Sequence, residues 1–297
     1  MIFDKREVKK AQILYWIFSV AGTAVAVYMM REISIHFYLR LLLIPAIFVG
    51  FVILVFPVHM VIIFIKTLIM APKMQKKWRA LASIKENDCD VIKYIEELHL
   101  LVESKHGRKY LKQNPALWLP VSLDFAYSYH YNGENDKAEE ITKEVLDSIE
   151  TSKAGKKMNI LLTCTAIQML TGLYIYKSKL EKAREYYAYL PEYYAVVSSW
   201  KANAKTKQIL YLWDKAIKEL DNAFLIAEGK FSEALPFYQK EWENSENTML
   251  TKVRIQYNLS LIYDGLGEDE KYKESLTYVA RHGNNTFMAR IAREKLG

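Results

Sequence analysis

The sequence predicts an all-α protein in which an N-terminal transmembrane helical hairpin precedes an α-solenoid. The 297 residues include 11 Gly and 7 Pro, about half the usual frequencies of roughly 7% and 5%, whereas all-β folds need many such turn residues. From Trp78 onward the apolar residues recur at helical spacing. Two long runs near the N-terminus carry no charged side chain.

These two runs predict membrane-spanning helices over about residues 11–30 and 41–65, the second with His59 as its only polar side chain. A helix that rises about 1.5 Å per residue crosses a hydrocarbon core of roughly 30 Å in about 20 residues. Helices of a soluble core, the alternative, rarely run this long without a charged face. We therefore expect a membrane anchor over residues 1–72 and a second domain over 73–297.

The basic residues around the runs predict the orientation. Four precede the first run, two lie in the connector 31–40, and five follow the second run. Since cytoplasmic flanks carry the excess of Lys and Arg, we expect a multi-pass cell-membrane protein with both termini in the cytoplasm. A signal peptide cleaved near Ala24–Ala26 is the alternative for the first run. The second domain is cytoplasmic under either interpretation.

The charge distribution argues against a nucleic-acid partner. The net charge is +7, and residues 1–109 hold 16 basic and 9 acidic groups, whereas residues 110–297 hold 25 of each. A solenoid without net positive charge lacks the basic surface that binds a polyanion. The excess includes a cluster suited to anionic lipid head groups, although orientation alone also explains it. The cluster comprises Lys73, Lys76, Lys77 and Arg79.

Four segments of the second domain repeat one pattern: a large residue, a turn residue four positions later, and a further residue, small in three cases, five beyond that. They are Tyr129/Gly133/Ala138, Tyr174/Ser178/Ala183, Leu225/Gly229/Ala234 and Tyr263/Gly267/Tyr272. The pattern resembles the tetratricopeptide (TPR) repeat, in which a small residue lets the helices of a pair approach closely. The steps of 45, 51 and 38 residues exceed the ~34 of a regular array, so the resemblance is to a divergent TPR-like solenoid over roughly 115–285.

Two terminal features are expected to depart from a regular array. Tyr272 stands where the pattern has a small residue, so we expect looser packing there or a terminal cap. Residues 78–112 are expected to form an initial helical pair with its turn at Asn87–Asp90.

In TPR proteins the first helices of the pairs line a concave groove that holds extended peptides or partner helices. Carried over onto this chain, the resemblance implies a groove that includes Leu123 and Glu219 and whose candidate partner-binding residues are Tyr127, His130, Tyr131, Gln168, Tyr176, Arg254, Tyr257 and Asp264. The alternative is that these tyrosines fill the core, because 21 Tyr exceed what a groove can use. The Lys and Asn clamp of chaperone-binding members is missing, so recognition of a C-terminal carboxylate is not implied.

We find no sequence motif of a nucleotide-binding, metal-binding or hydrolytic site, and we expect no catalytic residue, metal or cofactor. The chain contains no G-x-G-x-x-G, G-x-x-x-x-G-K-[ST], H-E-x-x-H or G-x-S-x-G. Glu96-x-x-His99 and Glu103-x-x-His106 have the spacing of di-iron bundles. We expect them on one helix, where the two His lie too far apart to share an ion. Two cysteines 75 positions apart are expected to be reduced and buried.

The sequence therefore predicts a membrane-anchored cytoplasmic scaffold or adaptor that binds a protein or peptide partner. The alternative is an accessory subunit of a membrane transporter or secretion complex, in which the hairpin makes the working contact. A membrane enzyme would need active-site residues that no motif supplies.

Overall fold

The computed structural model describes residues 13, 69–151 and 155–297. The predicted spans 11–30 and 41–65 lie outside these residues except at position 13. In the described part of the chain all regular elements are helical, which confirms the predicted all-α class. There, α7 is the one helix whose length and composition would allow it to cross a membrane, and 50% of its most apolar stretch is buried inside the structure.

The helices follow in chain order after a first helix over residues 69–86. They are α3 (Val91–Glu103), α4 (Lys105–Gly107), the π-helix η1 (Arg108–Lys112), α5 (Pro115–Tyr131), α6 (Asn135–Thr151), α7 (Lys156–Tyr176), α8 (Leu180–Tyr187), α9 (Leu190–Ser198), α10 (Ala204–Ala227), α11 (Phe231–Trp242), α12 (Met249–Leu266), α13 (Asp269–His282) and α14 (Phe287–Leu296).

Four tight turns join α5 to α6, α7 to α8, α10 to α11 and α12 to α13, and the helices of each pair pack on one another. Each turn contains a residue with positive φ, a conformation that Gly adopts at little cost and that ends helices. These residues are Gly133 (83°), Ser178 (54°), Gly229 (74°) and Gly267 (73°). The four turn positions read from the repeat pattern therefore coincide with turns.

The small residues of the pattern lie between the paired helices. Ala138, Ala183 and Ala234 are 0% exposed, as expected of small residues where two helices approach closely. Tyr272 remains partly exposed and packs at the edge of two core clusters.

Pro191 divides the second helix of the second repeat. A proline inside a helix lacks an N–H group and clashes with the carbonyl four residues earlier, and α8 ends at Tyr187, four residues before Pro191. The second helix of this pair is thus divided into α8 and α9, with Pro191 in the first turn of α9. The sequence reading did not predict this division.

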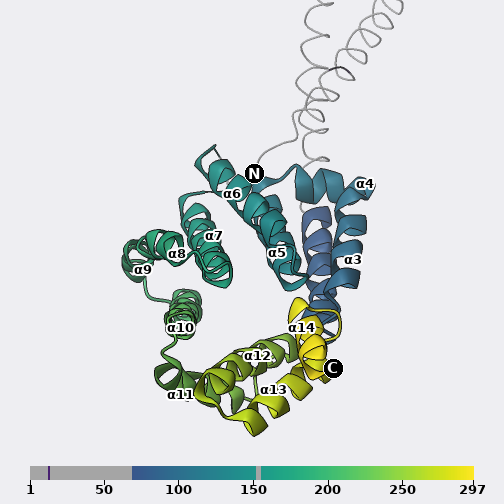
Figure 1. Ribbon diagram of the computed structural model, residues 1–297. Coiled ribbons are helices and arrows are strands. Elements are labelled where there is room, and N and C mark those ends of the chain that lie inside the picture. The colour runs from purple at the N-terminus through teal and green to yellow at the C-terminus, as the bar shows by residue number, and fades with distance from the viewer. Residues whose placement is uncertain (1–12, 14–68, 152–154) are drawn as a thin grey trace, which may run out of the picture.

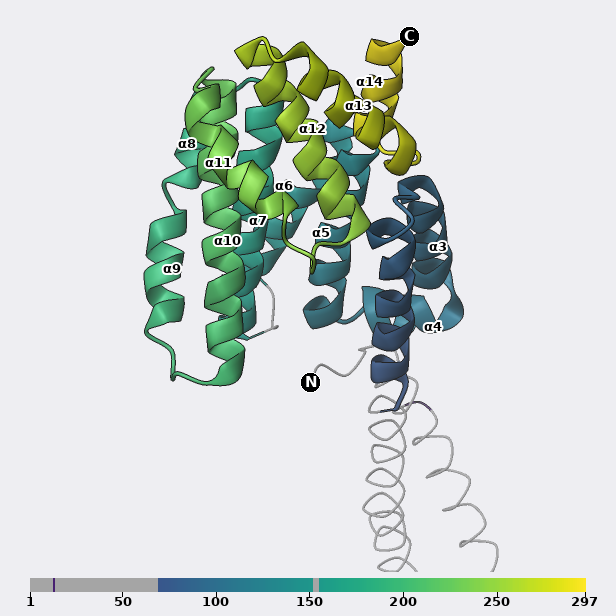
Figure 2. The same ribbon diagram turned by 90° about the horizontal axis from the view of Figure 1, so that it is seen from below.

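The helix pairs curve around a common centre, with α5, α7, α10 and α12 inside and α6, α8, α11 and α13 outside (Figure 1). Seen after a turn of 90°, α5, α7 and α10 stand side by side (Figure 2). The curve brings α14 back to the start of the described chain. Cys89, in the first turn, is buried in one cluster with Phe287 and Met288, and Arg290 Nη2 donates to the carbonyl of Asn132 at 2.6 Å. The solenoid therefore closes into one turn.

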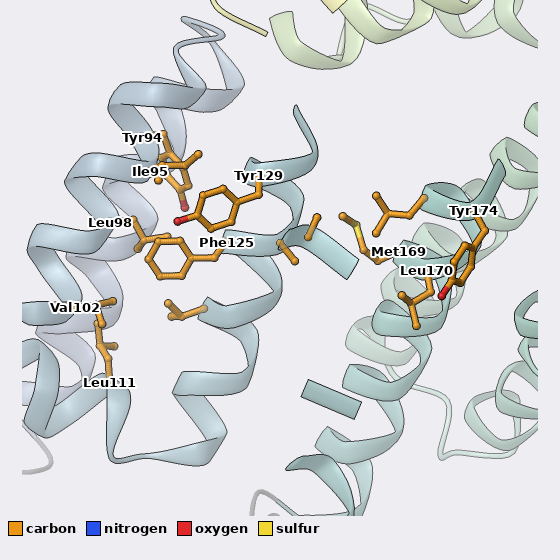
Figure 3. Packing of buried hydrophobic residues seen from close by; sticks show 14 of the residues in the cluster. Tyr94, Ile95, Leu98, Val102, Leu111, Phe125, Tyr129, Met169, Leu170 and Tyr174 are labelled. Atoms are coloured by element: carbon orange, nitrogen blue, oxygen red, sulfur yellow. The ribbon is translucent and has the colours of Figure 1, made fainter. Parts of the chain in front are cut away.

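The first core cluster joins α3, α5 and α7 (Figure 3). Beside it, Lys85, which is 6% exposed, pairs with the carboxylate of Asp124. That carboxylate also accepts hydrogen bonds from Trp78 Nε1 at 2.7 Å and from the hydroxyl of Tyr94. These contacts fix helix 69–86 on α3 and α5. The predicted boundary at residues 72 and 73 falls inside this continuous helix.

The two E-x-x-H pairs do not share a helix, so that expectation is wrong. Ser104 follows the last residue of α3, and its hydroxyl accepts from the N–H of Gly107 and caps the short α4, which contains His106. His99 instead contacts the hydroxyl of Tyr129 through Nε2 at 2.8 Å. Among the described residues, no group of three or more His, Cys, Asp or Glu is placed to hold a metal ion.

Candidate functional site: a tyrosine-lined central cavity

The inner helices enclose a partly open cavity of about 570 Å³. This volume lies in the range of roughly 300–1,000 Å³ that is typical of ligand pockets. Its walls come from α5, α7, α10 and α12, with contributions from α8, α11 and α14. The inner helices that line the cavity can be followed in Figure 1.

Most of the predicted groove residues line this cavity, and so does Glu219. They are Tyr127, His130, Tyr131, Gln168, Tyr176, Arg254 and Tyr257. Asp264 does not belong with them. It follows Tyr257 by seven residues, or about 10 Å of helix rise, and is exposed near the end of α12. Leu123 was expected in the groove as well, but it is buried in the core between α5, α6 and α7.

Two aromatic residues of the cavity were not predicted. Tyr238 lies on α11, a second helix, whereas the resemblance assigns the groove to first helices. Phe287 lies on α14, beyond the last repeat. Its sequence signal is weak, since an apolar residue after the N-cap Thr286 marks any helix that packs on a core.

Aromatic rings form one wall of the cavity. The ring centroid of Phe287 lies 5.0 Å from that of Tyr176, 5.5 Å from that of His130 and 5.9 Å from that of Tyr257. The Tyr176 and Tyr257 rings meet Phe287 edge to face, an arrangement that adds to the energy of burial. This wall joins α5, α7, α12 and α14 and offers a rigid apolar surface.

An ion pair on the cavity wall links α10 and α12. Arg254 Nη2 lies 2.9 Å from Oε1 and 3.0 Å from Oε2 of Glu219, and the side chains are 33% and 25% exposed because they face the cavity. Burial works against the guanidinium charge, but the Glu219 carboxylate outweighs it and raises the pKa of Arg254. The guanidinium of Arg254 therefore stays ionised, with the Glu219 carboxylate as its counter-charge.

The remaining titratable groups of the cavity are neutral near pH 7. Burial lowers the pKa of His130, and the charge of Arg254 adds to this effect. His130 Nδ1 carries a proton, since it lies 2.7 Å from Oδ1 of Asn135, an oxygen that only accepts. Burial raises the pKa of the tyrosines Tyr127, Tyr131 and Tyr238. The cavity therefore has no net charge.

Three residues that line this cavity each have a buried polar atom without a hydrogen-bond partner: Gln168 Nε2, Arg254 Nε and the Tyr238 hydroxyl oxygen. No other side chain in the described ranges has such an atom. Each group carries a hydrogen to donate, and leaving it buried and unpaired costs about 1–3 kcal/mol. Tyr238 is only 1% exposed. Unpaired donors gathered in one cavity are typical of a binding site.

The basic cluster lies on helix 69–86, away from the cavity. One stripe of this helix, formed by Met74, Trp78, Leu81 and Lys85, packs on the core. The four candidate lipid-binding residues are all exposed: Lys73, Lys76, Lys77 and Arg79.

Comparisons of the chain with known proteins do not extend this description. Neither a protein-family model, nor a curated protein, nor a solved structure matches it.

Proposed function

We propose that this protein is a membrane-anchored cytoplasmic scaffold that holds a segment of a protein or peptide partner in its central cavity. The observation that carries the proposal is the gathering of three unpaired donors and an aromatic wall around about 570 Å³ of space. Side chains from seven helices contribute, so the cavity requires the whole curved array. The resemblance to TPR repeats adds support, because their concave face binds peptides.

The membrane part of the proposal rests on the uncharged runs 11–30 and 41–65. Helix 69–86 follows the second run, and its exposed basic side chains would lie near anionic head groups. The contacts of Asp124 with Lys85 and Trp78 hold this helix on the solenoid. The cavity would therefore keep a fixed position at the membrane surface, where confinement raises the effective concentration of bound partners.

Gly172 provides a test that removes no functional group. It lies on α7 and lines the cavity, and the nearest atom to a Cβ built there is Leu220 Cδ2, at 3.9 Å. Gly172→Phe should fill the cavity, whereas Gly172→Ala adds one methyl group and serves as the control. A photo-crosslinking amino acid at Leu261, on the cavity wall, reports the occupant in cells. The same label at Tyr211, which is 63% exposed, reports background.

We expect a crosslinked partner from position 261 that is lost in Gly172→Phe and retained in Gly172→Ala. Crosslinking that persists in Gly172→Phe would contradict the proposal. The alternative role, in which the hairpin is the working contact of a transport or secretion complex, predicts a different result. Under this alternative, exchange of residues 11–65 for an unrelated hairpin abolishes cellular function, whereas filling the cavity with Gly172→Phe does not.

Membrane topology needs an introduced reporter. Cys89 and Cys164 are buried, and burial raises the pKa of each thiol to about 12, so both react poorly in any compartment. Ala202→Cys places a thiol in an exposed loop. A membrane-impermeant maleimide should label it in lysed cells and not in intact cells. Labelling in intact cells would refute the cytoplasmic location.

A further inference from the structure

We infer that the cavity binds a short, uncharged, mainly apolar stretch of peptide, whose backbone carbonyls accept hydrogen bonds from Gln168, Arg254 and Tyr238. This inference rests on the proposed function and specifies the chemistry of the occupant.

The unpaired groups require an occupant that supplies acceptors. Gln168 Nε2, Arg254 Nε and the Tyr238 hydroxyl each carry a hydrogen to donate. Their residues line the cavity from α7, α12 and α11 and therefore lie on different walls. A stretch of peptide presents carbonyl oxygens in several directions, and it can therefore satisfy donors that do not lie side by side.

The charges in the cavity select against an ionised occupant. Glu219 already holds the Nη2 edge of Arg254 at 2.9 and 3.0 Å. A carboxylate that approached Arg254 would meet the like charge of Glu219, and a Lys side chain that approached Glu219 would meet Arg254. Because an ion buried without a counter-charge is strongly disfavoured, a neutral segment fits best.

The walls and the volume favour apolar side chains. Tyr176, Tyr257 and Phe287 form a rigid aromatic surface, and apolar side chains bury favourably on such a surface. A cavity of about 570 Å³ accommodates a few residues rather than a folded domain. The partner must therefore present this segment from a loop or a terminus.

The experiment selects a random octapeptide library, displayed on phage, on the full chain in lipid nanodiscs. Selected peptides are synthesised with both ends capped and measured by fluorescence anisotropy. We expect uncharged central positions, and at least tenfold weaker binding when one central residue becomes Asp or Lys. Gln168→Leu and Tyr238→Phe should each weaken binding about three- to tenfold, the loss expected for one hydrogen bond. Gln208→Leu, at an exposed site on α10, is the matched control and should bind normally.

Selected peptides with charged central residues, or peptides whose affinity is independent of Gln168 and Tyr238, would overturn the inference. A selection that yields no binder would overturn it as well. The proposed function fails separately, when position 261 yields no crosslink that Gly172→Phe abolishes. A crosslinked partner together with charged selected peptides would retain the scaffold and reject the neutral segment.

Discussion

Asn285 and Val91 are separated by 194 positions in the sequence, yet Asn285 Oδ1 accepts a hydrogen bond from the backbone N–H of Val91 at 2.8 Å. The amide nitrogen of the same side chain donates to the carboxylate of Asp90, and Asn284 Nδ2 donates to the carbonyl of Asp88 at 3.0 Å. The loop before α14 thus supplies hydrogen bonds to the first turn and to the start of α3. These bonds close the solenoid at its seam.

Asn285→Ala tests how much this seam contributes to stability. It removes the acceptor for the N–H of Val91, a residue that is fully buried, and an unpaired buried donor costs about 1–3 kcal/mol. We expect a lower urea midpoint by chemical denaturation followed by circular dichroism. Asn222→Ala, which loses only a local bond to the carbonyl of Lys218, is the control. Equal midpoints for the two variants would mean that the seam adds nothing to stability.

Removal of the hydroxyl from Tyr174 and from Tyr238 should have different effects on the free energy of unfolding. Tyr174 donates to Glu139 Oε1 at 2.7 Å, so Tyr174→Phe should lower the free energy of unfolding by about 1.5–3 kcal/mol. The hydroxyl of Tyr238 has no partner, so Tyr238→Phe should leave stability unchanged or raise it by up to about 1 kcal/mol. Thermal unfolding of the protein without a bound partner measures both. Equal losses would show that the Tyr238 hydroxyl is satisfied within the folded chain.

Ala183→Leu tests the close approach of α7 and α8. Ala183 is 0% exposed, and added methyl groups in a filled site force the helices apart, at a cost of typically 1–3 kcal/mol. The melting temperature should fall. Ala195→Leu, at an exposed position of α9, should change it little. A normal melting temperature for Ala183→Leu would indicate that the pair tolerates a wider spacing.

Glu139 should make stability depend on acidic pH. Burial opposes its charge, but hydrogen bonds from Lys143, Lys177 and Tyr174 outweigh burial and lower its pKa from 4.5 to about 2. Because the folded-state pKa lies below the unfolded one, the stabilisation is complete above about pH 4.5 and is lost as the pH falls towards 2. With allowance for solvent screening, it amounts to about 1–2 kcal/mol.

The pH measurement compares unfolding free energies of the native protein and Glu139→Gln between pH 2 and pH 7. The difference between the two proteins should shrink as the pH falls below about 4.5. A difference that stays constant over this range would contradict the assigned pKa of Glu139.

The turns were predictable because they follow from a local rule, and the cavity-facing positions came from the resemblance to TPR repeats. A Gly at the end of a helix favours positive φ, which located Gly133, Gly229 and Gly267. The resemblance to TPR repeats then implied that Tyr127, Tyr131 and Arg254 face a groove. Asp264 shows the limit of this reasoning, since a carried-over face does not say how far along the helix axis a cavity extends.

The rest of the site depends on contacts that no local pattern encodes. Phe287 reaches the cavity only because the curve of the array returns α14 to the first helices, and the curvature sums small rotations over all pairs. Tyr238 lies on an outer helix yet enters the cavity from α11. The ion pair between Glu219 and Arg254 likewise joins two repeats. The distances between these residues depend on the three-dimensional arrangement of the helices and not on the local sequence.

The closure between Asn285 and Val91 also restricts how this chain can evolve. Open solenoids lengthen and shorten by duplication or loss of a repeat, because each unit contacts only its neighbours. Here an inserted pair would separate the loop before α14 from the first turn, and a deleted pair would make them collide. Repeat number is therefore fixed by geometry, and new specificity must arise through substitution of the residues that face inward.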